Sequence, residues 1–181
     1  MTLEEMKQKA YSLIEEYADE EDALTEDEDL ATKMNSVINQ IQNELARIKK
    51  IPAYATLEGS EGDIIDLNDT LDNFYQLDHV KGCDVDVFGT QIEFNEDGEL
   101  KAYYYRYPEQ ITEDTEDDFE FELSTDVLEI MPVGVAGTLL MSDVSNQYGQ
   151  NYLARYEQLK QNLDPRYTLP QVYIEGGIEG I

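Results

Sequence analysis

The chain has 181 residues, of which 41% are hydrophobic, and this is enough for one folded domain or for one domain that carries an inserted module. Its 41 Asp and Glu residues against 12 Lys and Arg residues give a formal net charge of -29. Such a surface repels nucleic-acid phosphates and anionic lipid head groups, which disfavours sequence-reading DNA binding and membrane binding. The simplest role of this charge is solubility, although an acidic wall would also let DNA slide past without sticking.

Cysteine usage and the first residues indicate the compartment. Cys83 is the only cysteine, so the chain forms no internal disulfide, which suits a reducing environment. The N-terminal residues lack the basic region and apolar run of a signal peptide, and no stretch approaches the roughly 18 apolar residues that span a membrane. We therefore expect a protein that is made and used in a cytoplasm.

Two amphipathic helices are predicted within residues 1–50. Thr2 and Glu5 form a capping box, and the apolar residues that follow recur at helical spacing: Leu3, Met6, Ala10, Leu13, Ile14 and Tyr17. A run with ten carboxylates (15–29) comes next, in which Asp27 and Asp29 are candidate caps for a second helix. The apolar stripe of that helix is Leu30, Met34, Val37, Ile38, Ile41, Leu45 and Ile48. Arg47, Lys49 and Lys50 suit the dipole at its end, and Pro52 is predicted to end it.

Residues 51–122 are predicted to form a β-rich inserted module. Short runs typical of strands cover 63–67, 80–88, 91–94 and 100–107, and the turn residues 95–98 predict that 91–107 is a hairpin. Along the last run Tyr103, Tyr105 and Tyr107 share one face, while Ala102, Tyr104 and Arg106 share the other. The tyrosine row is either a half-buried strand of the module's own sheet, which we favour, or an interface stripe. The module reads as a small antiparallel sandwich or barrel.

Residues 123–165 are predicted to complete the helical bundle. Ser124, Thr125 and Asp126 are candidate caps for a buried helix that runs from Val127 to Leu140. A further amphipathic helix over 143–163 carries a stripe of large side chains: Tyr148, Tyr152, Tyr156, Leu159 and Leu163. The fold class is therefore α+β, a small helical bundle with an inserted antiparallel β-module and an extended C-terminal arm.

The arm covers residues 166–181 and is too short to bury its apolar side chains alone. Its glycines and Pro170 disfavour a long helix. It is either a final strand on the subunit's own β-module or a segment that docks on another chain by strand addition. The candidate docking residues are Leu169, Val172, Tyr173, Ile174, Ile178 and Ile181.

We find no constellation that could carry catalysis or hold a cofactor or metal. His79 is the only histidine, and an ordinary loop residue is a simpler interpretation than a partner of Cys83. With 41 acids, a close carboxylate pair has no specificity. The segment from Asp84 begins like an EF-hand loop, but Phe88 stands at its fifth position and Asn95 at its twelfth, in place of a bidentate Glu. There is no phosphate-binding glycine loop.

The second half carries an extended pattern, which reads Leu128-Glu129-Ile130-Met131-Pro132-Val133-Gly134-Val135-Ala136, then Leu139-Leu140, Ser142-Asp143, Asn146-Gln147-Tyr148, Tyr152 and Arg155-Tyr156-Glu157-Gln158-Leu159. It resembles the head-to-tail adaptor proteins of tailed bacteriophages, in which a buried helix with a Pro-Gly-Val-Ala kind of centre precedes a helix with spaced tyrosines. The β-half is similar to gut-phage relatives through Tyr104-Tyr105-Arg106-Tyr107-Pro108-Glu109 and Ile111-Thr112-Glu113. The resemblance covers most of residues 28–176.

This resemblance implies a structural protein of the virion neck, assembled in the host cytoplasm. Such adaptors form a ring, commonly of about twelve copies, beneath the portal protein; they extend the DNA channel and present a docking surface to the tail-completion or stopper protein. A terminal arm often attaches the subunit to the portal, and no cofactor or catalytic residue is involved. The alternatives are a carbohydrate- or ligand-binding β-module on a helical stalk, which would need an aromatic cleft beside Tyr103, and, last, a small hydrolase that uses clustered acids.

Overall fold

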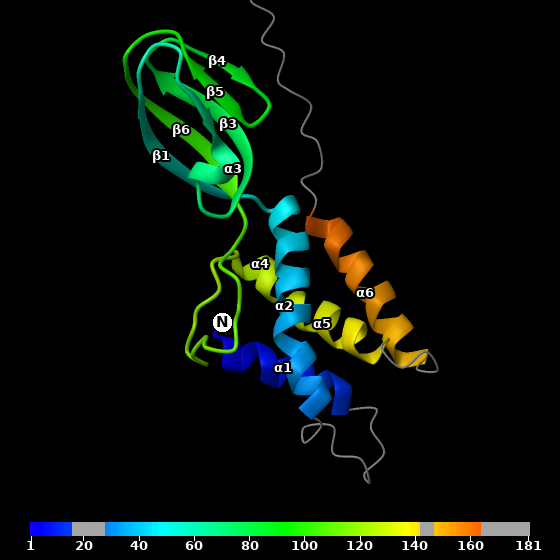
Figure 1. The fold of residues 1–181 in the computed structure, drawn as a ribbon. Helices are drawn as coiled ribbons and strands as arrows, with labels where there is room; N and C mark the ends of the chain where they lie inside the picture. The colour runs from blue at the N-terminus through cyan, green and yellow to red at the C-terminus, as the bar shows by residue number, and fades with distance from the viewer. Residues whose placement is uncertain (16–27, 142–146, 164–181) are drawn as a thin grey trace, which may run out of the picture.

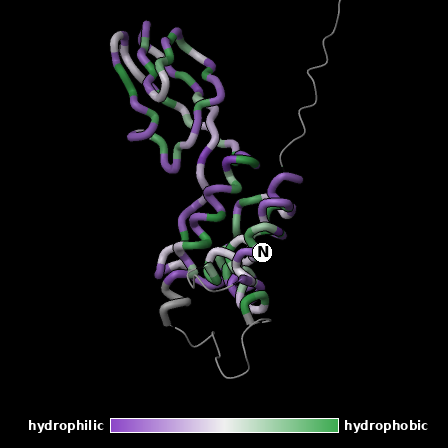
Figure 2. Tube along the Cα trace, turned by 90° about the vertical axis from the view of Figure 1, so that its right-hand side faces the viewer, coloured by the Kyte–Doolittle hydropathy of each residue, from purple (hydrophilic) through white to green (hydrophobic). Residues whose placement is uncertain are grey.

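The computed structural model describes residues 1–15, 28–141 and 147–163. The helices are α1 (Leu3–Glu15), α2 (Glu28–Ile48), α3 (Leu67–Thr70), α4 (Thr125–Leu128), α5 (Met131–Leu140) and α6 (Gln147–Leu163). The strands are β1 (Ile51–Gly59), β2 (Ile64–Asp66), β3 (Phe74–Gly82), β4 (Val85–Phe88), β5 (Gln91–Phe94) and β6 (Gly98–Arg106). The predicted α+β class is confirmed: a β-module stands at one end of a helical unit (Figures 1 and 2). Among the described residues, no helix combines the length and the apolar character needed to cross a membrane.

The capping and helix-ending residues predicted for α1 and α2 can be compared with the observed helix ends. The capping box is confirmed, because the Thr2 amide donates to Glu5 Oε2 at 3.1 Å and the Glu5 amide donates to Thr2 Oγ1 at 3.2 Å. Asp29 lies inside α2 and not at its cap, while Asp27 and Tyr17 lie outside the described residues. Pro52 does not end α2, which stops at Ile48; this proline lies in β1, an edge strand, where a missing amide proton is tolerated.

The buried centre of the helical unit is α5, which packs on α1, α2 and α6. The predicted single helix from Val127 to Leu140 is instead two, α4 and α5, and Pro132 lies in the first turn of α5, where its missing amide costs no hydrogen bond. A Cβ placed on Gly134 would lie 2.9 Å from two ring carbons of Tyr156. The glycine therefore allows α5 and the fully buried Tyr156 ring of α6 to approach closely.

The β-module consists of two three-stranded antiparallel sheets, one in the order β1-β6-β3 and the other in the order β2-β5-β4. One core lies between them and is formed by Leu57, Leu67, Leu71, Ile92, Phe94, Leu100, Ala102 and Tyr104. The module is therefore a small sandwich, which is one of the two architectures predicted.

Two strand predictions within the module are wrong. The hairpin predicted over 91–107 does not form, because β5 pairs with β2 and β4 whereas β6 pairs with β1 and β3. The run 80–88 is two strands in different sheets, separated at Gly82, whose φ of 144° is a conformation that few other residues adopt. The hairpin that does form joins β4 to β5 through Gly89 and Thr90, with φ of 67° at Gly89. Strand β1 was not predicted at all.

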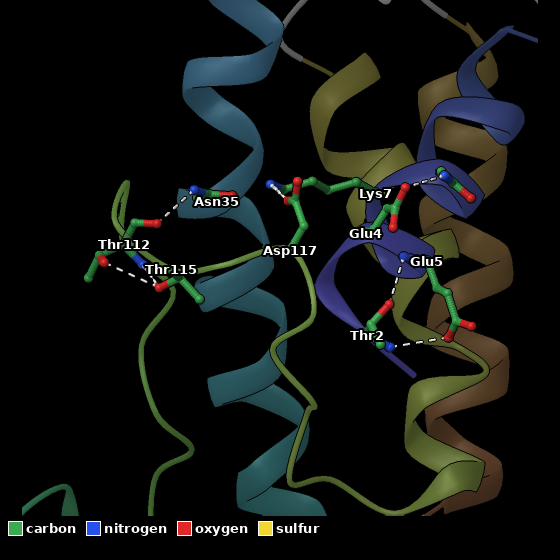
Figure 3. A network of polar contacts seen from close by, with 9 residues as sticks. Thr2, Glu4, Glu5, Lys7, Asn35, Thr112, Thr115 and Asp117 are labelled. Atoms are coloured by element: carbon green, nitrogen blue, oxygen red, sulfur yellow. Dashed lines mark hydrogen bonds and ion pairs between the residues drawn. The ribbon is translucent and has the colours of Figure 1, made fainter.

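An acidic segment, residues 107–124, follows β6 and packs on the helical unit, although its residues up to 122 were predicted as part of the β-module. Its apolar residues Ile111, Phe121 and Leu123 belong to the helical core. Figure 3 shows how polar contacts tie this segment to α1 and α2: Lys7 pairs with Asp117 at 3.1 Å, and Asn35 Nδ2 donates to the Thr112 carbonyl at 3.1 Å. A sparse set of apolar side chains thus anchors a chain that is otherwise carboxylate-rich and solvent-exposed.

Candidate functional site

The outer face of the β1-β6-β3 sheet gathers the tyrosines of β6. The predicted alternation is confirmed, since Ala102 and Tyr104 are buried in the sandwich core whereas Tyr103 and Tyr105 are half-buried on the opposite face. Side chains of successive strand residues point to opposite faces, so this arrangement follows from local sequence once the strand is placed. The tyrosine row thus belongs to a strand of the module's own sheet and faces outward from the sandwich core.

Tyr103 lies at the centre of this face. Its ring stacks on the His79 ring with centroids 4.5 Å apart and planes 10° apart. The Lys81 ammonium lies 5.3 Å from the Tyr103 centroid, and the Tyr54 ring lies 6.2 Å away. Tyr54 itself is 69% exposed. One tyrosine is thus held by a histidine, a lysine and a second, exposed tyrosine.

Tyr105 is held by a cation and a carboxylate. The Lys50 ammonium lies 4.6 Å from its ring centroid, and its hydroxyl donates to Asp78 Oδ1 at 3.2 Å. The other Asp78 oxygen contacts His79 Nδ1 at 2.7 Å. The hydrogen bond from His79 lowers the pKa of Asp78, and the charge of Asp78 raises the pKa of the Tyr105 hydroxyl. Asp78 is therefore ionised and Tyr105 protonated at neutral pH.

Tyr107, just after β6, connects this face to α2. The Arg47 guanidinium lies 5.7 Å from the Tyr107 centroid and its Nε donates to the Tyr107 hydroxyl at 3.3 Å, while the Tyr75 ring lies 5.0 Å away. From the sequence, Arg47 and Lys50 were expected only to interact with the dipole at the end of α2, and their contacts with tyrosine rings were not predicted. No local signal could have found them, because they depend on how the end of α2 lies against β6.

The same geometry bears on the residues considered for catalysis and metal binding. His79 lies on the outer face, whereas Cys83 packs against the core between the sheets, so the two side chains do not meet. The EF-hand-like segment is the β4–β5 hairpin, in which Asn95 Nδ2 donates to Asp86 Oδ2 at 3.3 Å. Within residues 1–15, 28–141 and 147–163, no group of three or more His, Cys, Asp or Glu side chains is arranged to hold a metal ion.

Two open cavities of similar volume lie in the helical unit and at its junction with the β-module. The first, of about 670 Å³, lies between α1, α5 and α6 and is lined by both signs of charge, with Lys9 and Arg155 facing Glu5 and Glu129. The second, of about 690 Å³, lies where α2 meets the β-module, and Tyr105 is the one aromatic residue in its lining. Neither has the aromatic walls that a sugar-binding cleft would show. A smaller cavity of about 220 Å³ on α6 is lined by two tyrosines, Tyr148 and Tyr152, together with Asn151 and Arg155.

Comparison with known proteins gives no further assignment. The chain matches no known family model, and no curated protein is significantly similar to it. The arm residues Leu169, Val172, Tyr173, Ile174, Ile178 and Ile181 lie outside the described residues.

Proposed function

We propose that this protein is a structural subunit of a bacteriophage neck, where it forms a homo-oligomeric ring beneath the portal, extends the DNA channel and docks the tail. The observation that carries the proposal is the resemblance of residues 128–159 to head-to-tail adaptors. Its partners would be further copies of itself, the portal and the tail-completion or stopper protein. DNA would pass through the channel without sequence-specific binding.

The residues that carry the resemblance are packing residues in this fold. Gly134 makes room for the Tyr156 ring, and the Tyr152 hydroxyl donates to the Leu13 carbonyl at 3.1 Å, which joins α6 to α1. Burial, together with the negative charge of Glu44, raises the pKa of Tyr156 far above its ordinary value. These side chains specify how α1, α5 and α6 meet.

The charge of the chain also supports a neck location. A net charge of -29 repels DNA phosphates, so a channel built from such subunits would not retain the DNA that passes through it. The proposal places this protein in the virion neck after assembly in the host cytoplasm.

The contacts of the tyrosine rings disfavour the alternative function, a carbohydrate- or ligand-binding module. A sugar site needs exposed aromatic faces, but His79 stacks on Tyr103 and Lys50 covers Tyr105. The exposed Tyr54 is a single ring on an open sheet face and not one wall of a cleft.

The first test is the mass of the full chain by light scattering at several salt concentrations, alone and with the portal ring of the same phage. A ring of many copies, formed alone or on the portal, is the expected result. A strict monomer that ignores the portal would overturn the proposal, and glycan binding would then be screened.

A second test addresses the arm. Deletion of residues 166–181 should abolish docking on the portal and leave the circular dichroism spectrum and the melting temperature close to those of the full chain. Normal docking by the truncated protein would show that the arm does not attach the subunit.

A further inference from the structure

The two sheets of the β-module present their outer faces in opposite directions, because their inner faces share one core. The β1-β6-β3 face is the tyrosine-bearing face described above. In the register of their strands, the β1-β6-β3 face carries a directly opposed lysine pair and, beside it, a directly opposed glutamate pair, Glu58 with Glu99. The β2-β5-β4 face carries a directly opposed pair of carboxylates, which is complementary to the lysine pair.

The β1-β6-β3 face carries an unneutralised pair of cations. Lys81 of β3 and Lys101 of β6 are exposed and directly opposite each other in the strand register. Like charges at such a position are destabilising in an isolated sheet. Among the described residues, neither ammonium group has a carboxylate partner. Beside them on this face lies the exposed ring of Tyr54.

The β2-β5-β4 face carries the matching pair of anions. Asp86 of β4 and Glu93 of β5 are directly opposite each other, and no basic side chain in the described part of the chain pairs with either. Two large apolar side chains flank them, Ile64 at 61% and Phe88 at 64% exposure. A monomer thus exposes apolar surface beside another costly like-charge pair.

We propose that the β2-β5-β4 face of one copy packs on the β1-β6-β3 face of the next, so that Asp86 and Glu93 meet Lys81 and Lys101. Both pairs span neighbouring strands, so the spacing within each pair is set by the same inter-strand distance of about 4.8 Å, and two carboxylates can face two ammonium groups at once. Phe88 and Ile64 of one copy then lie against the tyrosine-bearing face of its neighbour.

This contact explains how copies with the same net negative charge can associate. The overall repulsion is long-range and screened by salt, whereas the paired charges act at close range. The contact joins two different faces and is therefore heterologous, the kind of interface that generates a ring when its rotation closes. The inference rests on the proposed ring and names the surface that builds it.

Charge reversal tests the contact in the full chain. Lys81→Glu with Lys101→Glu makes both faces acidic, and Asp86→Lys with Glu93→Lys makes both faces basic. Each double variant alone should associate at least about tenfold more weakly than the wild type, measured by light scattering with and without the portal ring. An equimolar mixture of the two should recover assembly, since each variant then presents the face that the other lacks. The chain that carries all four substitutions should also assemble alone.

Lys9→Glu is the matched control, because it reverses one exposed lysine on α1 far from the β-module and should leave assembly unchanged. Far-ultraviolet circular dichroism checks that each variant is folded. If the wild type forms a ring and the reversed variants assemble equally well, this interface is wrong while the ring proposal stands. If the wild type stays monomeric even with the portal, both the interface and the ring proposal are wrong. Recovery in the mixture requires folded chains and distinguishes lost contact from lost structure.

Discussion

Gly82 controls the crossing of the chain from one sheet of the sandwich to the other, and its replacement by alanine tests the fold of the β-module. Its φ of 144° disfavours any side chain, and a Cβ at this position would lie 2.4 Å from the Glu99 carbonyl oxygen and 2.6 Å from Leu100 Cα. The first distance is about 0.9 Å short of the 3.3 Å at which carbon and oxygen normally approach. Both neighbours are backbone atoms of the central strand β6, so the clash cannot be relieved by a side-chain rotation.

The magnitude follows from a comparison with Gly62, which also has a positive φ, of 87°, but has nothing within 4 Å of a Cβ. Gly62→Ala should cost ~1 kcal/mol, since backbone strain of ~1–2 kcal/mol is partly offset by the lower entropy of the unfolded chain. Gly82→Ala adds overpacking of ~1–3 kcal/mol and the loss of the hydrogen bond from the Cys83 amide to the Glu99 carbonyl, 3.2 Å long. We expect a total of ~3 kcal/mol.

The assay is urea unfolding of the full chain, followed by circular dichroism at a far-ultraviolet wavelength and in the tyrosine band. The tyrosine band is informative because β6 and its neighbours carry several tyrosines whose rings touch. Equal stability of Gly82→Ala and Gly62→Ala would refute the reasoning, because it would mean that β6 yields to the added methyl group without cost.

Two other predictions concern how the acidic segment is fixed. The Asn39 side chain accepts a hydrogen bond from the Ile111 amide and donates one to the Ile111 carbonyl, both at 2.7 Å. Asn39→Ala would leave both backbone groups unpaired and should lower the free energy of unfolding by ~2 kcal/mol in the same urea assay. An unchanged unfolding midpoint would contradict this. Hydrogen bonds from Arg106 hold the pKa of Glu122 below its ordinary value of 4.5, so this carboxylate stabilises the fold above that pH and the contribution is lost as the pH falls through the lowered pKa. Glu122→Gln should therefore be less stable near neutral pH and lose less stability on acidification than the wild type, and parallel pH curves would argue against the role of this pair.

Several features could be read from the sequence because they depend on neighbours in the chain. The capping box of Thr2 and Glu5 and the apolar stripe of α2 lie within a few residues of one another, so helical periodicity reveals them directly. The two faces of β6 follow in the same way from the alternation of side chains along one strand. The pattern of apolar residues also predicts the mixed class of the fold, because helical and strand-like periods occupy separate stretches of the chain.

The tertiary structure alone decided which strands pair and what the faces of the module carry. Strands β5 and β6 are adjacent in sequence and belong to different sheets, since β5 pairs with β4 and with β2, whereas β6 pairs with β1 and β3. The meeting of Lys81 with Lys101 on one face, and of Asp86 with Glu93 on the other, depends on that pairing and on its register. Periodicity indicates which side of an element is buried, but the pairing and register of the strands determine which side chains lie next to one another.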